Sequence, residues 1–214
     1  MKKVLFFVLF CFLSELKAVD IFKPKASTPN AMFVENLLKP KDFNKSNDLT
    51  RNVGSFDVTT GELLYLKGKI TDAFDIPIAN ATVQIWQTNS AGKYQNILSK
   101  TDLKYDENFK TSGTSKTDNL GLYGFKTIFP GFENADRAPH VNIIITHREY
   151  GTIITEVYFE DHKMNARDAI YQSYTDDEKR MLTAKVVYTN QYDLSEGKVA
   201  TFNIVMDGIH AYKK

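Results

Sequence analysis

The sequence predicts an all-β fold, a β-sandwich with an irregular N-terminal arm and little helix. Three observations predict it: short runs rich in Val, Ile, Tyr, Phe and Thr recur after Gly61, turn residues bound each run, and some runs alternate polar and apolar side chains. The 214 residues, 43% of them hydrophobic and 25% charged, are enough for one sizeable core.

Seven runs are expected to form strands: 63–70, 81–87, 121–128, 140–146, 152–159, 185–189 and 199–206. Residues 82–87 alternate as a sheet with one buried face requires. Strands in this number, with so little helix, indicate a sandwich. Trp86, Tyr123 and Phe125 are expected in its core.

Two short helices are expected late in the chain. One covers residues 166–171, and the other starts at Asp176 and ends near Leu182. Thr175 can cap the second helix, and the acidic residues that open it suit the positive end of a helix dipole.

Residues 1–18 have the pattern of a secretory signal peptide. Lys2 and Lys3 precede the apolar run 4–13, and Ala18 supplies the small residue before a cleavage site. The run has about half the length of a bilayer-spanning helix, which favours cleavage over an uncleaved anchor or a buried core segment. We therefore expect an exported protein, periplasmic or secreted, with no membrane attachment after cleavage. Cys11 is the single cysteine and lies in this run, so the mature chain would contain no disulfide.

The remainder divides into an arm over 19–60 and one domain over 61–214. Pro24, Pro29 and Pro40 break any regular element in the arm. The formal net charge of +1 argues against a nucleic-acid partner, because such a face needs clustered Lys and Arg.

The residues taken alone give one weak candidate site. His140 and Asn142 are two positions apart in an expected strand, so their side chains share a face. Such a pair fits either part of a metal site or a hydrogen-bonded structural histidine, and the second is the commoner case. The sequence contains no nucleophile triad order, phosphate loop or zinc-ligand spacing.

A series of motifs is more specific. They are Trp86-Gln-Thr-Asn-Ser-Ala-Gly-Lys-Tyr94, Asp106-Glu-Asn-Phe109, Gly121-Leu-Tyr-Gly-Phe125, Thr127-Ile-Phe-Pro-Gly131, Arg137-Ala-Pro-His140 and Asn165-Ala-Arg-Asp168. In order and spacing this series resembles the intradiol ring-cleavage dioxygenases, over nearly everything after the signal peptide.

The resemblance implies a β-sandwich that holds a mononuclear Fe(III) and cleaves catechols, small aromatic diols, with O₂. Fe(III) is a hard ion that favours anionic oxygen donors, and the family binds it with two tyrosinates and two histidines. By this resemblance Tyr94 is the first tyrosine, His140 is the first histidine, and Arg137 stabilises charge on the substrate.

Two of the four implied ligand positions differ. Glu133 stands where the second tyrosine is expected and Asn142 where the second histidine is expected. The candidate metal ligands are therefore Tyr94, His140, Glu133 and Asn142, although Glu133 also fits a solvated loop. Two hypotheses stay open: a dioxygenase with an altered iron site, or a non-catalytic binding or subunit-like module on the same scaffold. A homo- or hetero-oligomer is compatible with either.

Overall fold

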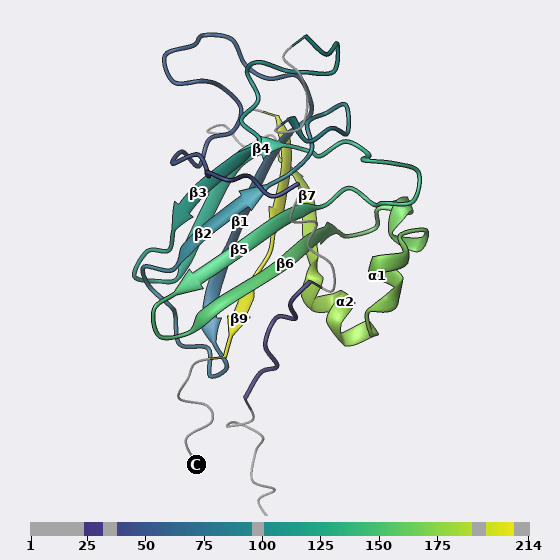
Figure 1. Ribbon diagram of the computed structural model, residues 1–214. Helices are drawn as coiled ribbons and strands as arrows, with labels where there is room; N and C mark the ends of the chain where they lie inside the picture. Colours follow the sequence, from purple (N-terminus) through teal and green to yellow (C-terminus); the bar gives the residue numbers. More distant parts are fainter. Residues whose placement is uncertain (1–23, 32–37, 96–100, 190–195, 208–214) are drawn as a thin grey trace, which may run out of the picture.

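The computed structural model describes residues 24–31, 38–95, 101–189 and 196–207 (Figure 1). The expected signal peptide and Cys11 lie outside these residues. None of the helices in the described part of the chain is long and apolar enough to cross a lipid bilayer.

Nine strands lie within the described residues. They are β1 (Leu63–Asp72), β2 (Thr82–Trp86), β3 (Ser112–Lys116), β4 (Leu122–Ile128), β5 (Val141–His147), β6 (Gly151–Phe159), β7 (Thr183–Thr189), β8 (Gly197–Thr201) and β9 (Ile204–Met206). The strand order is β3-β2-β5-β6-β7-β8-β1-β4, and β9 pairs with β1.

The strands form two layers around one core. The first layer, β3-β2-β5-β6, is antiparallel, and it joins the second only through a short parallel pairing of β6 with β7. Both layers bury apolar side chains in the same cluster, among them Val83, Ile143 and Val157 from the first and Leu64 and Leu66 from the second. The predicted all-β sandwich is confirmed.

Two strand predictions were wrong in detail. The run 199–206 is interrupted, because the Asn203 side chain accepts a hydrogen bond from the Lys69 backbone N–H at 3.0 Å, where a continuous ladder would use a carbonyl. The result is two strands, β8 and β9. Strand β3 was not expected, since its sequence Ser-Gly-Thr-Ser-Lys has no bulky apolar residue; it pairs with β2 at a sheet edge.

Three short helical pieces follow β6: the 3-10 helix η2 (Lys163–Ala166), α1 (Ala169–Ser173) and α2 (Asp176–Leu182). The helix expected over 166–171 begins later, because the Asp168 side chain accepts from the N–H groups of Ile170 and Tyr171 and so caps α1. Helix α2 and its Thr175 cap are confirmed, with Glu178 completing a capping box.

The helices lie beside β6 and β7 (Figure 1). They pack there through a second apolar cluster, which contains Ala138, Tyr158, Tyr174 and Leu182. Ala138 and Tyr158 also belong to the polar surroundings of His140, so this cluster fixes one side of the candidate site.

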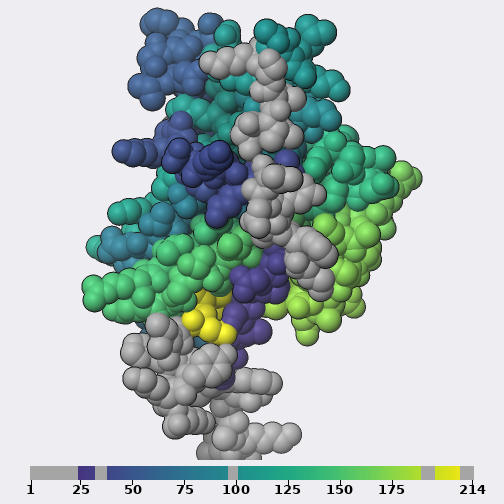
Figure 2. All heavy atoms as spheres, viewed as in Figure 1, coloured from purple at the N-terminus to yellow at the C-terminus, as the bar shows by residue number. Residues whose placement is uncertain are grey.

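The described part of the arm contains no helix and no extended strand. Its backbone bonds to the sandwich: the Thr28 N–H donates to the Val205 carbonyl at 2.9 Å, and the Ala31 N–H donates to Ile154 at 2.7 Å. Figure 2 shows residues 24–31, in purple, beside the green strands and the yellow C-terminal strand. A domain boundary at residues 60 and 61 stays a prediction.

Candidate functional site

A cavity of about 460 Å³ opens beside the ends of β2, β5 and β6. This volume is typical of small-molecule sites. Four apolar residues line part of the cavity: Leu38, Trp86, Ala169 and Ile170. Polar side chains line the rest: Tyr94, Glu133, Asn134, Asp136, Arg137, His140, Asn142 and Glu156. All five residues predicted for the site line this one cavity. Trp86, expected only as core, is both buried and part of the wall.

Three of the predicted side chains form a hydrogen-bonded chain at the buried base of the cavity. The Tyr94 hydroxyl lies 3.3 Å from Nε2 of His140, and the Asn142 amide nitrogen donates to that hydroxyl at 3.0 Å. Tyr94, His140 and Asn142 are each about 5% exposed. The expectation that His140 and Asn142 share a face is confirmed.

The hydrogen bonds of His140 assign its tautomer. Nδ1 lies 2.8 Å from the Ala138 carbonyl oxygen, which can only accept, so Nδ1 carries the proton. Nε2 is then the nitrogen with the lone pair, and it faces the Tyr94 hydroxyl and the Arg137 guanidinium, each at 3.3 Å. An imidazole held in this way presents a lone pair to the cavity, as a metal ligand or proton acceptor must.

Burial raises the pKa of the Tyr94 hydroxyl well above its ordinary value, and the negative charge of Glu133 raises it further. The hydrogen bond from Asn142 and the charge of Arg137 act in the opposite direction but do not offset these effects. Tyr94 therefore holds its proton at neutral pH unless a cation comes close to it.

Two loops meet backbone to backbone to place Tyr94 near Glu133. The Gly131 N–H donates to the Asn89 carbonyl at 3.0 Å. Gly92 has φ +73°, and a Cβ there would lie 1.6 Å from the Phe132 carbonyl oxygen, so only glycine fits. The sequence motifs around Tyr94 and Pro130-Gly131 are thus two halves of one structural unit.

The turn at Asp106 stabilises the loop that carries Tyr94. Gln95, next to Tyr94, donates from its side chain to the Asp106 carbonyl at 2.9 Å. Partial burial opposes ionisation of the Asp106 carboxyl, but hydrogen bonds from Thr59, Thr60 and Asn108 outweigh it and lower its pKa.

Ionisation of the Asp106 carboxyl should make the free energy of unfolding depend on pH in the acidic range. A carboxyl with a lowered folded pKa stabilises the fold above its unfolded pKa of about 3.9, and this stabilisation disappears as the pH falls through the folded pKa. Relative to Asp106→Asn, the free energy of unfolding of the wild type should therefore fall as the pH drops below about 4. Urea titrations of both proteins across this range measure it, and parallel pH profiles would contradict it.

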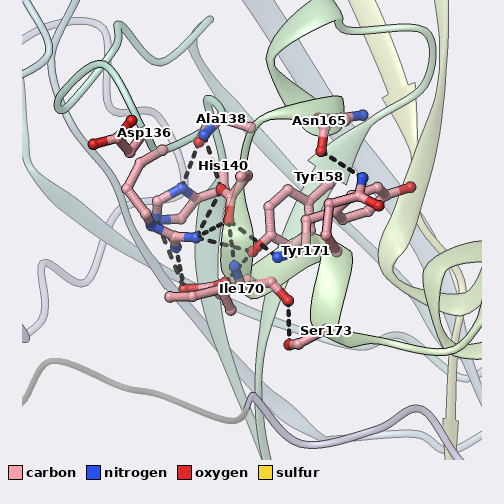
Figure 3. A network of polar contacts seen from close by, with 12 residues as sticks. Asp136, Ala138, His140, Tyr158, Asn165, Ile170, Tyr171 and Ser173 are labelled. Carbon is pink, nitrogen blue, oxygen red and sulfur yellow. Dashed lines mark hydrogen bonds and ion pairs between the residues drawn. The ribbon is translucent and has the colours of Figure 1, made fainter.

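A buried ion cluster borders the same cavity and was not predicted. The Arg137 guanidinium contacts Glu156 and Asp168 at 2.7 Å each, and the two carboxylates are 4% and 0% exposed in their side chains. Glu156 also accepts from the Tyr158 hydroxyl at 2.5 Å. Figure 3 shows this network, with His140, Tyr158 and Ile170 around it and Asp136 at its edge. The cluster carries one negative charge in excess.

Comparisons with known proteins agree with this geometry. A family model described as "Dioxygenase" matches residues 36–208. A Rickettsia felis protein named "Putative dioxygenase" is 32% identical over 170 residues, which are 73% of this chain and 81% of the relative. The protocatechuate 3,4-dioxygenase beta chain of Burkholderia cepacia is 33% identical over 132 residues, 58% of this chain and 56% of that one. The chain belongs to the intradiol ring-cleavage dioxygenase family.

A solved structure supports the fold of this intradiol dioxygenase family member. The intradiol ring-cleavage dioxygenase from Tetranychus urticae superimposes with a TM-score of 0.60 at 18% identity, covering 88% of this chain and 95% of the other. At this identity the likeness concerns the β-sandwich alone.

The donors present fit a hard cation such as the family's Fe(III). The excess negative charge of the ion cluster is buried beside the cavity, where a cation would offset it. A cation would also lower the pKa of Tyr94 and turn its hydroxyl into an anionic oxygen donor. Among the described residues no three His, Cys, Asp or Glu side chains meet as a metal site, so the set combines phenol, imidazole, carboxylate and amide.

Glu133 and the ion cluster show the limits of sequence reasoning. Glu133 is half-buried in a loop, lines the cavity and acts on Tyr94 through its charge, which is compatible with both the ligand and the solvated-loop alternatives. Glu156 lies directly opposite Asn142 in the β5–β6 register and two positions from Tyr158. A charged residue in an otherwise apolar expected strand was the signal that could have identified it.

Proposed function

We propose that this intradiol family member is a metal-dependent dioxygenase for a small aromatic diol, with a metal held by Tyr94, His140, Glu133 and Asn142. One observation carries the proposal: the Tyr94 hydroxyl and the His140 lone pair meet at 3.3 Å on the buried base of a cavity that accommodates one aromatic ring. The Burkholderia relative is named for a diol of this kind, protocatechuate.

The side chains of the cavity have distinct roles in this proposal. Ferric iron, when bound, supplies the Lewis acidity and the redox chemistry with O₂ that ring cleavage needs. Nε2 of His140 is a lone-pair donor, and Asn142 orients the Tyr94 hydroxyl. Trp86 and Ile170 pack against the ring and exclude water.

Arg137 places positive charge next to the ring. Burial opposes that charge, but Glu156, Tyr158 and Asp168 together raise the pKa of the guanidinium, so it stays protonated. In this position Arg137 stabilises negative charge that develops on the diol oxygens.

The altered donor set affects metal binding. Glu133 adds a carboxylate where the family resemblance implies a tyrosinate, and Asn142 adds a neutral amide where it implies an imidazole. An amide is the weaker ligand for Fe(III), so we expect weaker iron binding than a set of two tyrosinates and two imidazoles would give.

A second candidate function is a non-catalytic binding or subunit-like module. Asn142 favours it, because its amide nitrogen donates both to Tyr94 at 3.0 Å and to the Trp86 carbonyl at 3.3 Å. These bonds hold the base of the cavity together through protein groups alone.

Metal analysis and spectroscopy of matched variants test the proposal. The mature chain, supplied with Fe(III), should bind iron and show a visible tyrosinate-to-iron charge-transfer band, and it should consume O₂ with catechol. Tyr94→Phe should lose the band and most of the iron. Tyr123→Phe is the matched control, because Tyr123 is equally buried, bonds to the Phe202 carbonyl at 2.8 Å and does not line the cavity.

The outcomes separate the two candidates. Iron that remains in full in Tyr94→Phe contradicts the proposed ligand set. Colourless protein that binds catechol, measured by calorimetry, but never consumes O₂ supports the binding module. Protein that binds neither iron nor catechol contradicts the dioxygenase and the binding module, and leaves the subunit-like module.

Export and oligomer formation are also part of the proposal. Residues 1–18 support export by their sequence alone. Mass spectrometry of protein from the producing cell's exterior or periplasm should find a chain that begins at Val19. The Burkholderia relatives are named as alpha and beta chains of one enzyme, which makes a homo- or hetero-oligomer a reasonable form for this chain.

A further inference from the structure

The cavity has a buried end and an open end. Tyr94, His140 and Asn142 form the buried base, while Asn134 and Asp136 are exposed at the rim. A diol whose hydroxyl groups reach Tyr94 and His140 directs the opposite edge of its ring toward the rim. A substituent on that edge therefore meets the charges of the outer wall.

Positive charge is scarce in this wall. Arg137 is the one Lys or Arg among the described residues that line the cavity, and it lies toward the base. Its guanidinium is already paired with Glu156 and Asp168 at 2.7 Å each. A carboxylate on the ring would have to compete with two buried carboxylates for it.

Negative charge is present from base to rim. Glu133 and Asp136 line the cavity and are acidic, and Glu156 lies deeper. Among the described residues that line the cavity, Arg137 alone opposes these three carboxylates, so the cavity has a negative electrostatic field. This field attracts a positive substituent and repels a negative one.

We infer that the cavity selects diols whose ring substituent is positively charged or neutral, and discriminates against ring carboxylates. The inference rests on the proposed function, since it requires that an aromatic diol enters the cavity hydroxyl groups first. It concerns the exposed carboxylate of Asp136 at the rim and the prior pairing of Arg137 with Glu156 and Asp168.

Three ligands of nearly equal shape test it: 3,4-dihydroxybenzylamine, 3,4-dihydroxybenzamide and 3,4-dihydroxybenzoate carry positive, neutral and negative substituents. Their dissociation constants for the mature chain, measured by isothermal titration calorimetry at pH 7 and low salt, should rise in that order. We expect roughly tenfold between the amine and the carboxylate. Binding is the readout, so the test does not depend on turnover.

A matched pair of variants shows which side chain causes the difference in affinity between the amine and the carboxylate. Asp136→Asn should bring the dissociation constants of the amine and the carboxylate closer together, because it removes one negative charge from the rim. Asp57→Asn removes an exposed acid that does not line the cavity, and it should leave the ratio of the two constants unchanged. Higher salt should also narrow the ratio in the wild type.

The outcomes distinguish a failure of the charge selection from a failure of the proposed function. Equal affinities for the three ligands, or tighter binding of the carboxylate, overturn the charge selection and leave the diol site standing. Binding of none of the three at millimolar concentration overturns both.

Discussion

Replacing Arg137 with methionine is expected to lower the free energy of unfolding by about 3–5 kcal/mol. The guanidinium is the shared partner of Glu156 and Asp168, whose side chains are 4% and 0% exposed. Without it, two buried carboxylates face each other with no cation between them, and each has lost a charged hydrogen bond. Methionine fills a similar volume, so the loss reports the charge and not a cavity. Urea denaturation at pH 7 measures it.

A surface arginine provides the control for this prediction. Arg51 lies 3.9 Å from Asp48 and both side chains are substantially exposed, so Arg51→Met should change stability by less than about 1 kcal/mol. Adding Glu156→Gln to Arg137→Met should recover part of the loss. An Arg137→Met protein as stable as Arg51→Met would mean that water enters the cluster and solvates the carboxylates.

Replacing Gly92 with alanine is expected to cost about 2–4 kcal/mol of stability and to weaken ligand binding as well. The new Cβ would lie 1.6 Å from the Phe132 carbonyl oxygen, a backbone atom, so the two loops must separate. Their separation moves Tyr94 away from Glu133. We expect iron or diol affinity to fall about 10–100-fold, as when a ligand loses its support. Thermal unfolding and calorimetry measure the two effects.

Substitution of Gly151 measures the cost of the left-handed backbone conformation without a steric clash. Its φ of +78° is close to that of Gly92, but a Cβ there has no atom within 4 Å. Gly151→Ala should therefore cost only the left-handed backbone conformation, about 1–2 kcal/mol, and leave ligand affinity intact. Equal losses in the two variants would show that the contact between the loops is not what holds Tyr94 in place.

Much of the fold follows from local sequence, and the exceptions have physical causes. Alternation in residues such as 82–87 predicted strands because one face of each is buried. Strand β3 could not be predicted, since its small polar residues join the sheet only because β2 offers an unpaired edge. The break between β8 and β9 depends on the Asn203 side chain reaching Lys69, a contact between residues 134 positions apart.

The residues of the site also divide into those that the sequence predicted and those that it did not. Tyr94 and His140 were predicted from their motifs and Asn142 from its spacing to His140, and the structure brings their side chains within hydrogen-bond distance. Glu156 and Asp168 were missed as site residues, because pairing with Arg137 depends on the β5–β6 register and on the start of α1. Sequence spacing alone gives neither the β5–β6 register nor the contact between the start of α1 and Arg137.

Asp168 links the cavity to a helix. One oxygen of its carboxylate accepts the backbone N–H groups of Ile170 and Tyr171 and also pairs with Arg137. Fraying of the first turn of α1 must therefore disturb the guanidinium, and a ligand that fixes the guanidinium must slow that fraying. The amide proton of Tyr171, a residue outside the cavity wall, is thus a hydrogen-exchange reporter of whether the cavity is filled.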